Sequence, residues 1–444
     1  CCGAGGMAAA AAATEPLGVD ASGMSPALAL ALALSLRRGD YFMLMAEPNC
    51  CAGCVPNNPL AAIEVFAVED LDLAAGPLRL TGTLHVETDD RDQWRYQLRA
   101  ARPASGATRR SLLVAGSLFC LPVPALAQSD GTAVDLHSHG GNIIRASYGR
   151  EGLLDVAGPM KKGGVAAICL AIVADSPVIS SSGGRIRPNR TPRPGELYDF
   201  SKTQFGKVHE VVRGQSMTIV KTATDLRAAR ASQPAVIVTS EGADFLEGRI
   251  ERLDEAYQRW HLRQLQLTHY RPNELGDIQT EPAEKGGLTD FGAEVIRRCN
   301  TLGIVVDVAH GTFELVKRAV ATTSKPLVLS HTALSDRPYP WTRLITSDHA
   351  RAIVSVRGVI GVWPVQQVQN VSSYATDIAR MVDVAGIDHV GIGTDQMGLP
   401  GGSSMPSYAD VPQLVAALST RFKPDEIAKL MGGNYRRVFE AALG

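Results

Sequence analysis

The chain has 444 residues, of which 45% are hydrophobic and 20% charged, a composition that is ordinary for a globular protein with a large core. Its 44 Lys and Arg residues are balanced by 45 Asp and Glu residues, for a formal net charge of −1. Such a balance provides no basic field of the kind that nucleic-acid binding requires, so we expect no nucleic-acid partner.

The N-terminal part of the chain differs in character from the rest. Residues 1–40 are rich in Ala and Leu and of low complexity, and we expect them to be disordered. Residues 41–104 contain the strand-like runs IEVFAV and LRLTGTLHV, which predict a small β-rich segment. This segment resembles a small uncharacterised bacterial family with a cysteine-rich turn. Its C-x2-C spacing, Cys51 to Cys54 beside Cys50, has no second pair elsewhere, which favours a structural turn over a metal or redox site.

Residues 105–130 have the pattern of an export signal or a linker. Paired arginines at residues 109–110 precede an apolar run at residues 112–121, and the small-residue sequence ALA follows at residues 125–127. This order predicts a twin-arginine signal at residues 108–127 and a bacterial, periplasmic mature protein without a stable membrane span. An internal buried helix and a single membrane span are the alternatives. We favour a true start just upstream of the paired arginines over a signal that has decayed into a linker.

Residues 131–444 alternate apolar, β-branched runs with helix-like stretches such as residues 312–322 and 348–357. Eight runs end near the following residues: His139, Ala174, Glu241, His269, His310, His331, Val365 and Asp395. Strand alternating with helix is typical of parallel sheets, and the length suits one (β/α)8 TIM-like barrel of the α/β class. The polar insertion at residues 176–198 lacks apolar periodicity, which predicts a loop over or beside the mouth of the barrel.

Residues of the types that bind metal ions lie at these strand ends: His137, His139, Glu241, His310 and His331. The C-terminal ends of barrel strands converge on one mouth, so side chains from distant segments can meet there. His137 and His139 are two residues apart on an extended chain, so both point to the same face and can bind one ion. A buried carboxylate at Glu241 is costly unless a cation balances it, and a bridge between two metal ions would do so.

Three further residues are candidates for the chemistry of the site. Asp395 closes the last strand, where a carboxylate can act as general acid and base or support a histidine ligand instead. His269 ends the fourth run and could stabilise a developing oxyanion, with a core-edge histidine as the alternative. Arg343 could pair with a substrate carboxylate through its planar fork. A solvated arginine is the alternative there, and Arg337 is the competing candidate.

From Val134 onward, the chain resembles the renal, or membrane, dipeptidase family of binuclear zinc hydrolases. The matching motifs, in order, are DLHSH, SEG, LQLTHYRPNELGD, GLTDFGAEVIRRCNTLGIVVDVAH, KPLVLSH, GVIGVW, GIDHVGIGTDQMG and GGNYRRVF. The resemblance implies a TIM-like barrel with two Zn²⁺ ions bridged by Glu241. His137 and His139 would complete the first zinc site, and His310 and His331 the second. It also implies that His269 polarises the substrate, that Asp395 is the acid/base residue and that Arg343 binds the substrate carboxylate.

Three departures from the family pattern bear on this interpretation. The family commonly has H-x-D where this chain has His139, so the first zinc site loses an anionic ligand. The segment that holds Arg343 is one residue longer than usual and reads RLITSD. Gln396 and Met397 replace a Phe-Asp pair, which removes a nearby carboxylate and points to a drift in substrate preference.

The sequence therefore predicts an exported, zinc-dependent dipeptidase that hydrolyses the amide bond of a dipeptide with a metal-activated hydroxide. One alternative is a related amidohydrolase that acts on a lactone, a cyclic amide or a phosphoester, because the same barrel serves many reactions. Another is a non-catalytic barrel that binds metal poorly because of His139. The expected partner is the small dipeptide substrate, and a homodimer is left open.

Overall fold

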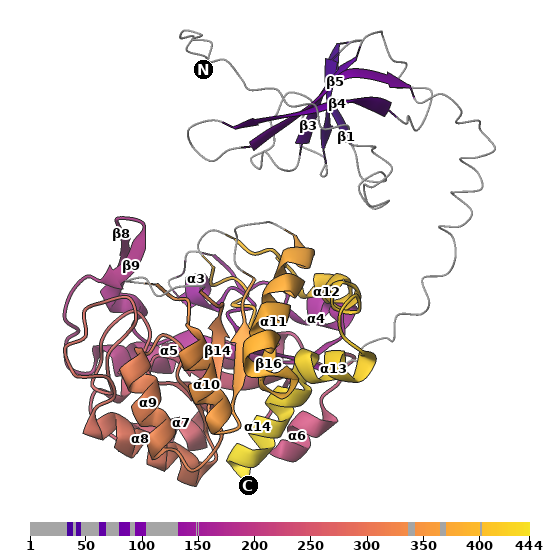
Figure 1. Cartoon of the computed structure of the whole chain (residues 1–444). Coiled ribbons are helices and arrows are strands. Elements are labelled where there is room, and N and C mark those ends of the chain that lie inside the picture. The colour runs from indigo at the N-terminus through magenta and orange to yellow at the C-terminus, as the bar shows by residue number, and fades with distance from the viewer. Residues whose placement is uncertain are drawn as a thin grey trace. The chain divides into compact units, whose positions relative to one another are not determined.

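The computed structural model describes residues 33–38, 41–45, 62–67, 80–88, 94–103, 132–147, 149, 151–335, 342–364, 370–399 and 402–444. The chain forms two compact units, residues 1–123 and residues 124–444 (Figure 1). Several residues named in the sequence predictions lie outside the described part: Cys50, Cys51, Cys54, Arg337, Val365 and the signal-like segment 108–127. The export signal and the cysteine turn therefore stay predictions.

The N-terminal unit contains a five-stranded sheet with the order β1-β2-β3-β5-β4. Its strands are β1 (Ala33–Arg38), β2 (Tyr41–Met45), β3 (Ala62–Ala67), β4 (Leu80–Thr88) and β5 (Trp94–Pro103). Neighbouring strands pair antiparallel except β3 and β5, which pair parallel. Strand β1 lies within the stretch that was predicted to be disordered. That expectation was wrong for these six residues, because their backbone pairs with β2 whatever the complexity of the sequence.

The second unit is a nearly closed barrel of eight parallel strands, as the sequence predicted. In chain order the strands are β6 (Ala133–Ser138), β7 (Val165–Val173), β11 (Ala235–Glu241), β12 (Leu262–Gln266), β13 (Val305–Asp307), β14 (Val328–Thr332), β15 (Val359–Val362) and β16 (Val390–Ile392). A short strand, β10 (Thr218–Ile219), adds to the start of β11. A bridge between Ser138 and Gln396 joins the first strand to the segment after the last one. The backbone N–H of His139 donates to the Gln396 carbonyl there, at 2.9 Å.

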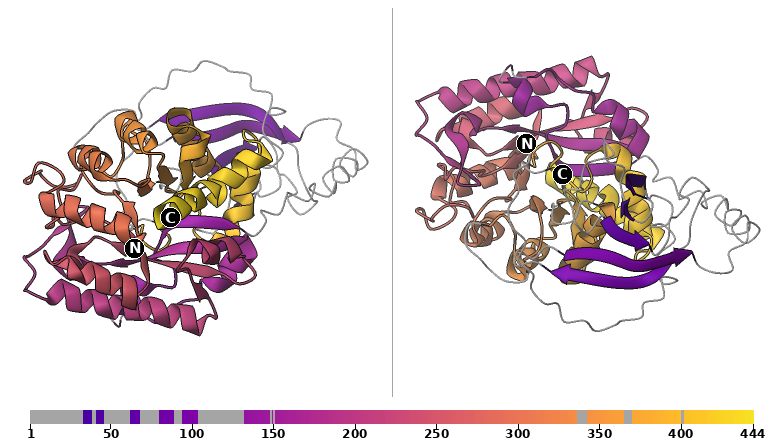
Figure 2. Two further views of the ribbon diagram at one scale, coloured as in Figure 1. Left: turned by 90° about the horizontal axis from the view of Figure 1, so that it is seen from below. Right: turned by 90° about the horizontal axis from the view of Figure 1, so that it is seen from above.

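Helices form the outer layer around the strands, as the views from below and above show (Figure 2). They are α3 (Ile143–Ser147), α4 (Ala157–Gly163), α5 (Glu196–Gly214), α6 (Ala223–Ala228), α7 (Glu251–Arg259), α8 (Asp290–Leu302), α9 (Phe313–Thr322), α10 (Ser347–Ser355), α11 (Val371–Ala385), α12 (Val411–Leu418), α13 (Pro424–Ala428) and α14 (Asn434–Leu443). Short 3-10 turns cover Ser176–Val178, Asp244–Leu246, Ile387–His389 and Tyr408–Asp410, and a π turn covers Lys429–Gly433. The two helices predicted at residues 312–322 and 348–357 are α9 and α10.

The core has two layers because barrel strands are buried on both faces. One cluster packs the outward strand faces against the surrounding helices. The other fills the inside of the barrel and includes Leu136, Ile237 and Val305. Helix α14 closes this inner cluster with Tyr435 and Phe439, and it packs against β6, β13, β15 and β16. With the barrel interior filled by side chains, polar residues collect at the C-terminal ends of the strands.

The insertion at residues 176–198 is not the irregular loop that the sequence predicted. It contains an antiparallel hairpin of β8 (Ile179–Ser182) and β9 (Arg185–Pro188), and α5 begins at Glu196. The turn consists of Gly183 and Gly184, with φ values of 58° and 74°. Two adjacent residues with positive φ make the turn that suits two-residue hairpins. The Gly-Gly pair therefore indicated a hairpin, although the flanking residues show no apolar alternation.

Among the described residues, no helix is both long enough and sufficiently apolar to span a bilayer.

Candidate metal centre

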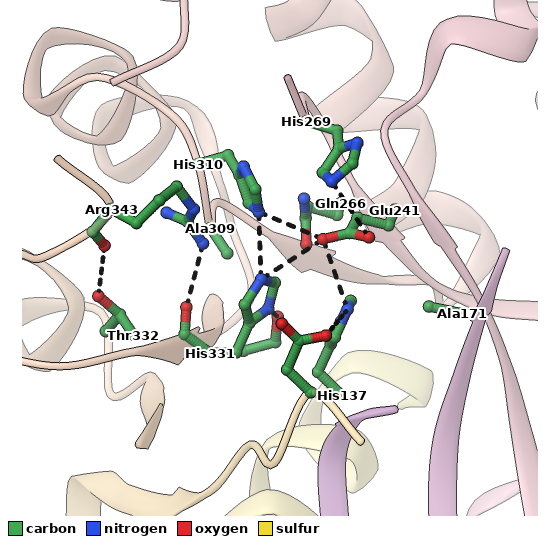
Figure 3. A network of polar contacts seen from close by, with 12 residues as sticks. His137, Ala171, Glu241, Gln266, His269, Ala309, His310, His331, Thr332 and Arg343 are labelled. Atoms are coloured by element: carbon green, nitrogen blue, oxygen red, sulfur yellow. Dashed lines mark hydrogen bonds and ion pairs between the residues drawn. The ribbon is translucent and has the colours of Figure 1, made fainter. Parts of the chain in front are cut away.

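Five predicted ligands meet at the mouth of the barrel, and Figure 3 labels all of them except His139. They come from four strands or the residues just after them: His137 and His139 from β6, Glu241 from β11, His310 after β13, and His331 from β14. None of these residues is more than 3% exposed. We call His137 and His139 the first pair, and His310 and His331 the second pair.

Glu241 lies between the two pairs and contacts all four histidines. Its Oε1 is 3.2 Å from His310 Nε2 and 3.4 Å from His331 Nε2, within the second pair. In the first pair, Oε1 is 3.5 Å from His137 Nε2, and Oε2 is 3.2 Å from His139 Nε2. Burial alone would raise the pKa of Glu241, but the neighbouring histidines, led by His269 and His137, hold it well below its usual value. The carboxylate is therefore an anion placed between two groups of nitrogen donors.

The donor set fits metal ions. Each pair brings two Nε2 atoms together, at 3.2 Å in the first pair and 3.1 Å in the second. Each pair with Glu241 forms a group whose ligand atoms lie within 4.8 Å of one another. Two neutral imidazole nitrogens that face each other can share only one proton, whereas a cation accepts both lone pairs at once. Nitrogen with one carboxylate is a donor set that suits zinc.

Hydrogen bonds to the other ring nitrogens orient one histidine of each pair. His139 Nδ1 lies 3.0 Å from the Ala171 carbonyl oxygen, so it carries the proton and Nε2 keeps its lone pair. His331 Nδ1 lies 2.9 Å from the Ser330 hydroxyl. Burial lowers the pKa of His310 and of His331 well below the usual value, which keeps the second pair neutral. Neutral imidazoles are the form that binds metal.

Two buried aspartates accept hydrogen bonds from the backbone next to the two pairs. Asp135 accepts from the backbone N–H of His137 at 3.3 Å, and from the backbone and hydroxyl of Thr394 at 2.8 and 2.6 Å. It thereby ties the first strand of the barrel to the segment before Asp395. Asp307 accepts from the backbone N–H groups of Ala309 and Ser330, at 3.0 and 3.1 Å.

These two networks hold the backbone that carries each pair. His310 has φ 68° and Asp395 has φ 48°, a left-handed conformation that non-glycine residues rarely adopt. Such strain persists only where the surrounding structure enforces it, and it is concentrated at functional sites. We infer that this backbone conformation fixes the positions of the His310 and Asp395 side chains at the barrel mouth.

Asp395 lies at the edge of the first pair. Its Oδ1 is 3.4 Å from His139 Nε2 and 3.9 Å from His137 Nε2. Burial raises the pKa of Asp395, although the two histidines oppose the rise. A carboxylate with a raised pKa beside a metal-binding group can take up a proton and release it again.

His269 follows β12 and contacts Glu241 Oε2, the oxygen that His139 also contacts. Its Nε2 is 3.3 Å from Glu241 Oε2, and its Nδ1 is 2.7 Å from Asp175 Oδ1. Burial would lower the pKa of His269, but the charges of Asp175 and Glu241 raise it to about 9. The ring is then an imidazolium, a hydrogen-bond donor rather than a base.

The sequence pattern did not predict the position of Asp175 beside His269. It is the residue directly after the second predicted strand end, Ala174, and is fully buried. Its second oxygen accepts from the backbone N–H of Tyr270 at 3.0 Å. Its position at a strand end was a signal, but nothing in the pattern distinguished it from an ordinary loop aspartate.

Arg343 faces the second pair. Its Nη2 donates to the His331 carbonyl oxygen at 3.3 Å, and its Nη1 donates to Gln279 Oε1 at 3.0 Å. The guanidinium lies over the ring of Trp363, 5.3 Å from its centroid. The residue is 8% exposed, and burial lowers its pKa from the usual value. The solvated surface position that was the alternative for Arg343 is thus excluded.

Comparison with known proteins gives this arrangement a family. The sequence profile of membrane dipeptidases (peptidase family M19) matches residues 152–443. The chain belongs to the membrane dipeptidase family. The match includes the second pair and Glu241, while His137 and His139 lie before its first residue.

Individual relatives agree with this assignment. Dipeptidase tcpJ of Claviceps purpurea (strain 20.1) is 26% identical over 225 residues, which cover 48% of this chain and 52% of the relative. The chain thus spans about half the length of that curated relative.

Two solved structures share the fold. A metallopeptidase from Rhodobacter sphaeroides, liganded with a phosphinate mimic of the dipeptide L-Ala-D-Ala, has a TM-score of 0.59 and 20% identity. That match covers 70% of this chain and 99% of the other. The probable dipeptidase PvdM from Pseudomonas aeruginosa has a TM-score of 0.60 and 16% identity, over 76% of this chain and 99% of the other. At these identities the two structures support the barrel fold of the membrane dipeptidase family.

Proposed function

We propose that this chain is a dipeptidase that works with two zinc ions. His137, His139 and Glu241 would hold the first ion, and Glu241, His310 and His331 the second. Family membership supports a peptidase, and the nitrogen-rich ligand groups favour zinc. The observation that carries the proposal is the single carboxylate, Glu241, placed within reach of both histidine pairs.

When bound, such ions lower the pKa of water and polarise the carbonyl group of the scissile amide. Asp395 would take the proton of the attacking water and deliver it to the leaving amine. Its raised pKa and its place beside His139 support this role. Because Asp395 contacts both histidines of the first pair, we place the attacking water on the side of that pair.

His269 and Arg343 would bind the substrate. The protonated ring of His269, fixed by Asp175, would donate a hydrogen bond to the oxyanion that develops on the carbonyl oxygen. Arg343 would bind the free carboxylate of the dipeptide, since its guanidinium is buried beside the second pair and remains charged.

The test is metal content and turnover of the same full-length preparation. We expect elemental analysis to find two zinc ions per chain, and dipeptides with a free carboxylate to be hydrolysed. Zero or one ion together with inactivity toward all dipeptides would contradict the proposal. Turnover of lactones, cyclic amides or phosphoesters alone would then point to the related amidohydrolase reaction.

The signal-like segment at residues 108–127 supports a location outside the cytoplasm. The size of the secreted product would test this location.

A further inference from the structure

The guanidinium of Arg343 is held by Gln279 and by the His331 carbonyl, and the Tyr270 side chain also hydrogen-bonds to it. Nη1 donates to Gln279 and Nη2 donates to the backbone carbonyl of His331. Nε is buried without a hydrogen-bond partner in the described part of the chain. Since Nε and Nη2 share one edge of the guanidinium, Nε–H and the second N–H of Nη2 form a fork. A fork of this shape fits the two oxygens of a carboxylate.

Gln279 holds the Nη1 side of the Arg343 guanidinium. Its Oε1 accepts from Arg343 Nη1 at 3.0 Å, and its Nε2 donates to the Leu344 carbonyl oxygen at 3.2 Å. Its backbone N–H donates to the carbonyl oxygen of His310 at 2.8 Å. One residue thus links a histidine of the second pair to the arginine and to the backbone beside it.

The loop that carries Gln279 is itself firmly held. Asp277, which is fully buried, accepts hydrogen bonds from the backbone N–H groups of Glu284, Lys285 and Gly287, at distances between 2.8 and 3.1 Å. A carboxylate that closes a loop in this way limits the movement of the residues within it. Gln279 therefore provides a fixed point for the arginine.

We propose that Gln279 is a positioning residue that orients the guanidinium of Arg343. It thereby sets the distance between the second pair and the substrate carboxylate. This inference rests on the proposed function. A fixed distance favours substrates with a single amide bond between the metal centre and the carboxylate. The chain then selects dipeptides over tripeptides, and free acids over the corresponding amides.

The test uses two variants of nearly the same size as the wild type. Gln279→Glu places a carboxylate against Nη1 of Arg343, where it neutralises the positive charge that attracts the carboxylate of the substrate. Gln279→Met keeps the length of the side chain and removes both of its hydrogen bonds. Gln413→Glu, at an exposed position on α12, is the control that adds the same charge outside the loop. Each protein is assayed with a dipeptide, its C-terminal amide and the tripeptide extended by one residue, and zinc content is measured in parallel.

For Gln279→Glu we expect KM for the dipeptide to rise about tenfold or more, with kcat within about threefold of wild type and KM for the amide unchanged. For Gln279→Met we expect the preference for dipeptide over tripeptide to fall about tenfold. Zinc content should equal that of the wild type in both. Equal losses on acid and amide, or unchanged preferences in both variants, would overturn the role of Gln279. A wild-type protein that hydrolyses none of the three substrates would instead overturn the proposed function.

Discussion

The two histidine pairs of the metal centre are built in different ways. His137 and His139 lie two residues apart on one strand, so the geometry of an extended chain alone turns both side chains to one face. His310 and His331 are 21 residues apart, at the ends of two neighbouring strands with α9 between them. The parallel pairing of these two strands brings their Nε2 atoms to 3.1 Å. The first pair is thus a local feature of the sequence, and the second is a product of the fold.

The surroundings of the two pairs differ as well. The first pair has Asp395 at its edge, a group suited to proton transfer. The second pair has Arg343 and Gln279, groups suited to holding an anion. Glu241 is the point where the two halves meet. We infer that one half of the site is arranged for the chemistry and the other for substrate placement.

The largest effect on zinc content and turnover should come from replacing Glu241, the carboxylate that contacts both pairs. In Glu241→Gln the carboxylate that both candidate ligand groups share becomes a neutral amide of the same size, so both groups lose its negative charge. We expect the loss of both ions and a fall in turnover of about 10⁴-fold. Elemental analysis and kinetics on one preparation would check this, with circular dichroism as the control for folding. Two retained zinc ions would show that the pairs bind metal independently of Glu241.

A smaller loss should follow when only the chemistry of the first half is removed. Asp395→Asn keeps the size of the side chain and removes its ability to accept a proton. We expect turnover to fall about 10³-fold while zinc content and KM stay near wild type. Steady-state kinetics with a dipeptide would show this split. Loss of a zinc ion in this variant would mean that Asp395 serves as a ligand, and the division between the two halves would need revision.

His139→Asp sharpens the comparison by changing only the first pair. A carboxylate brings a negative charge and favours hard cations, whereas imidazole favours zinc. We expect affinity for Mn²⁺ relative to Zn²⁺ to rise about tenfold at one site of the metal-free protein, and the other site to keep its preference. Competitive metal titration followed by calorimetry would resolve the two sites. A change at both sites would show that the pairs are coupled through Glu241.

The sequence predicted the barrel and the meeting of the five candidate ligands at its mouth, because both depend on simple periodicity. Each apolar run marks a parallel strand, and residues at the ends of such strands share one mouth. The same reasoning could not find Asp175, Gln279 or the supporting aspartates. Their roles depend on contacts such as that between Asp175 and His269, 94 residues apart, which no local pattern records. The hairpin of β8 and β9 was missed for another reason, since its strands are exposed and carry no alternation of apolar residues.

The smallest effect on turnover should come from a change in helix α10, which follows the segment that carries Arg343. His349 in the first turn of this helix accepts from the Thr346 hydroxyl through Nδ1 at 3.1 Å. Burial lowers the pKa of His349 from 6.5 to about 4. Between these values the unfolded chain binds a proton that the folded chain does not. Stability from this residue is therefore complete above about pH 6.5 and is lost as the pH falls toward 4.

His349→Gln tests this, because a glutamine oxygen can accept the same hydrogen bond and never gains a charge. We expect the wild type to lose stability relative to the variant by on the order of 2–3 kcal/mol between pH 7 and pH 4. Urea unfolding across this range would measure the difference, which should be constant above pH 7. Turnover at pH 8 should be the same in both proteins, since His349 supports the helix and touches neither histidine pair. A difference in stability that does not change with pH would mean that His349 titrates alike in the folded and unfolded chains, and the acid sensitivity of this half would then have to come from its metal ligands.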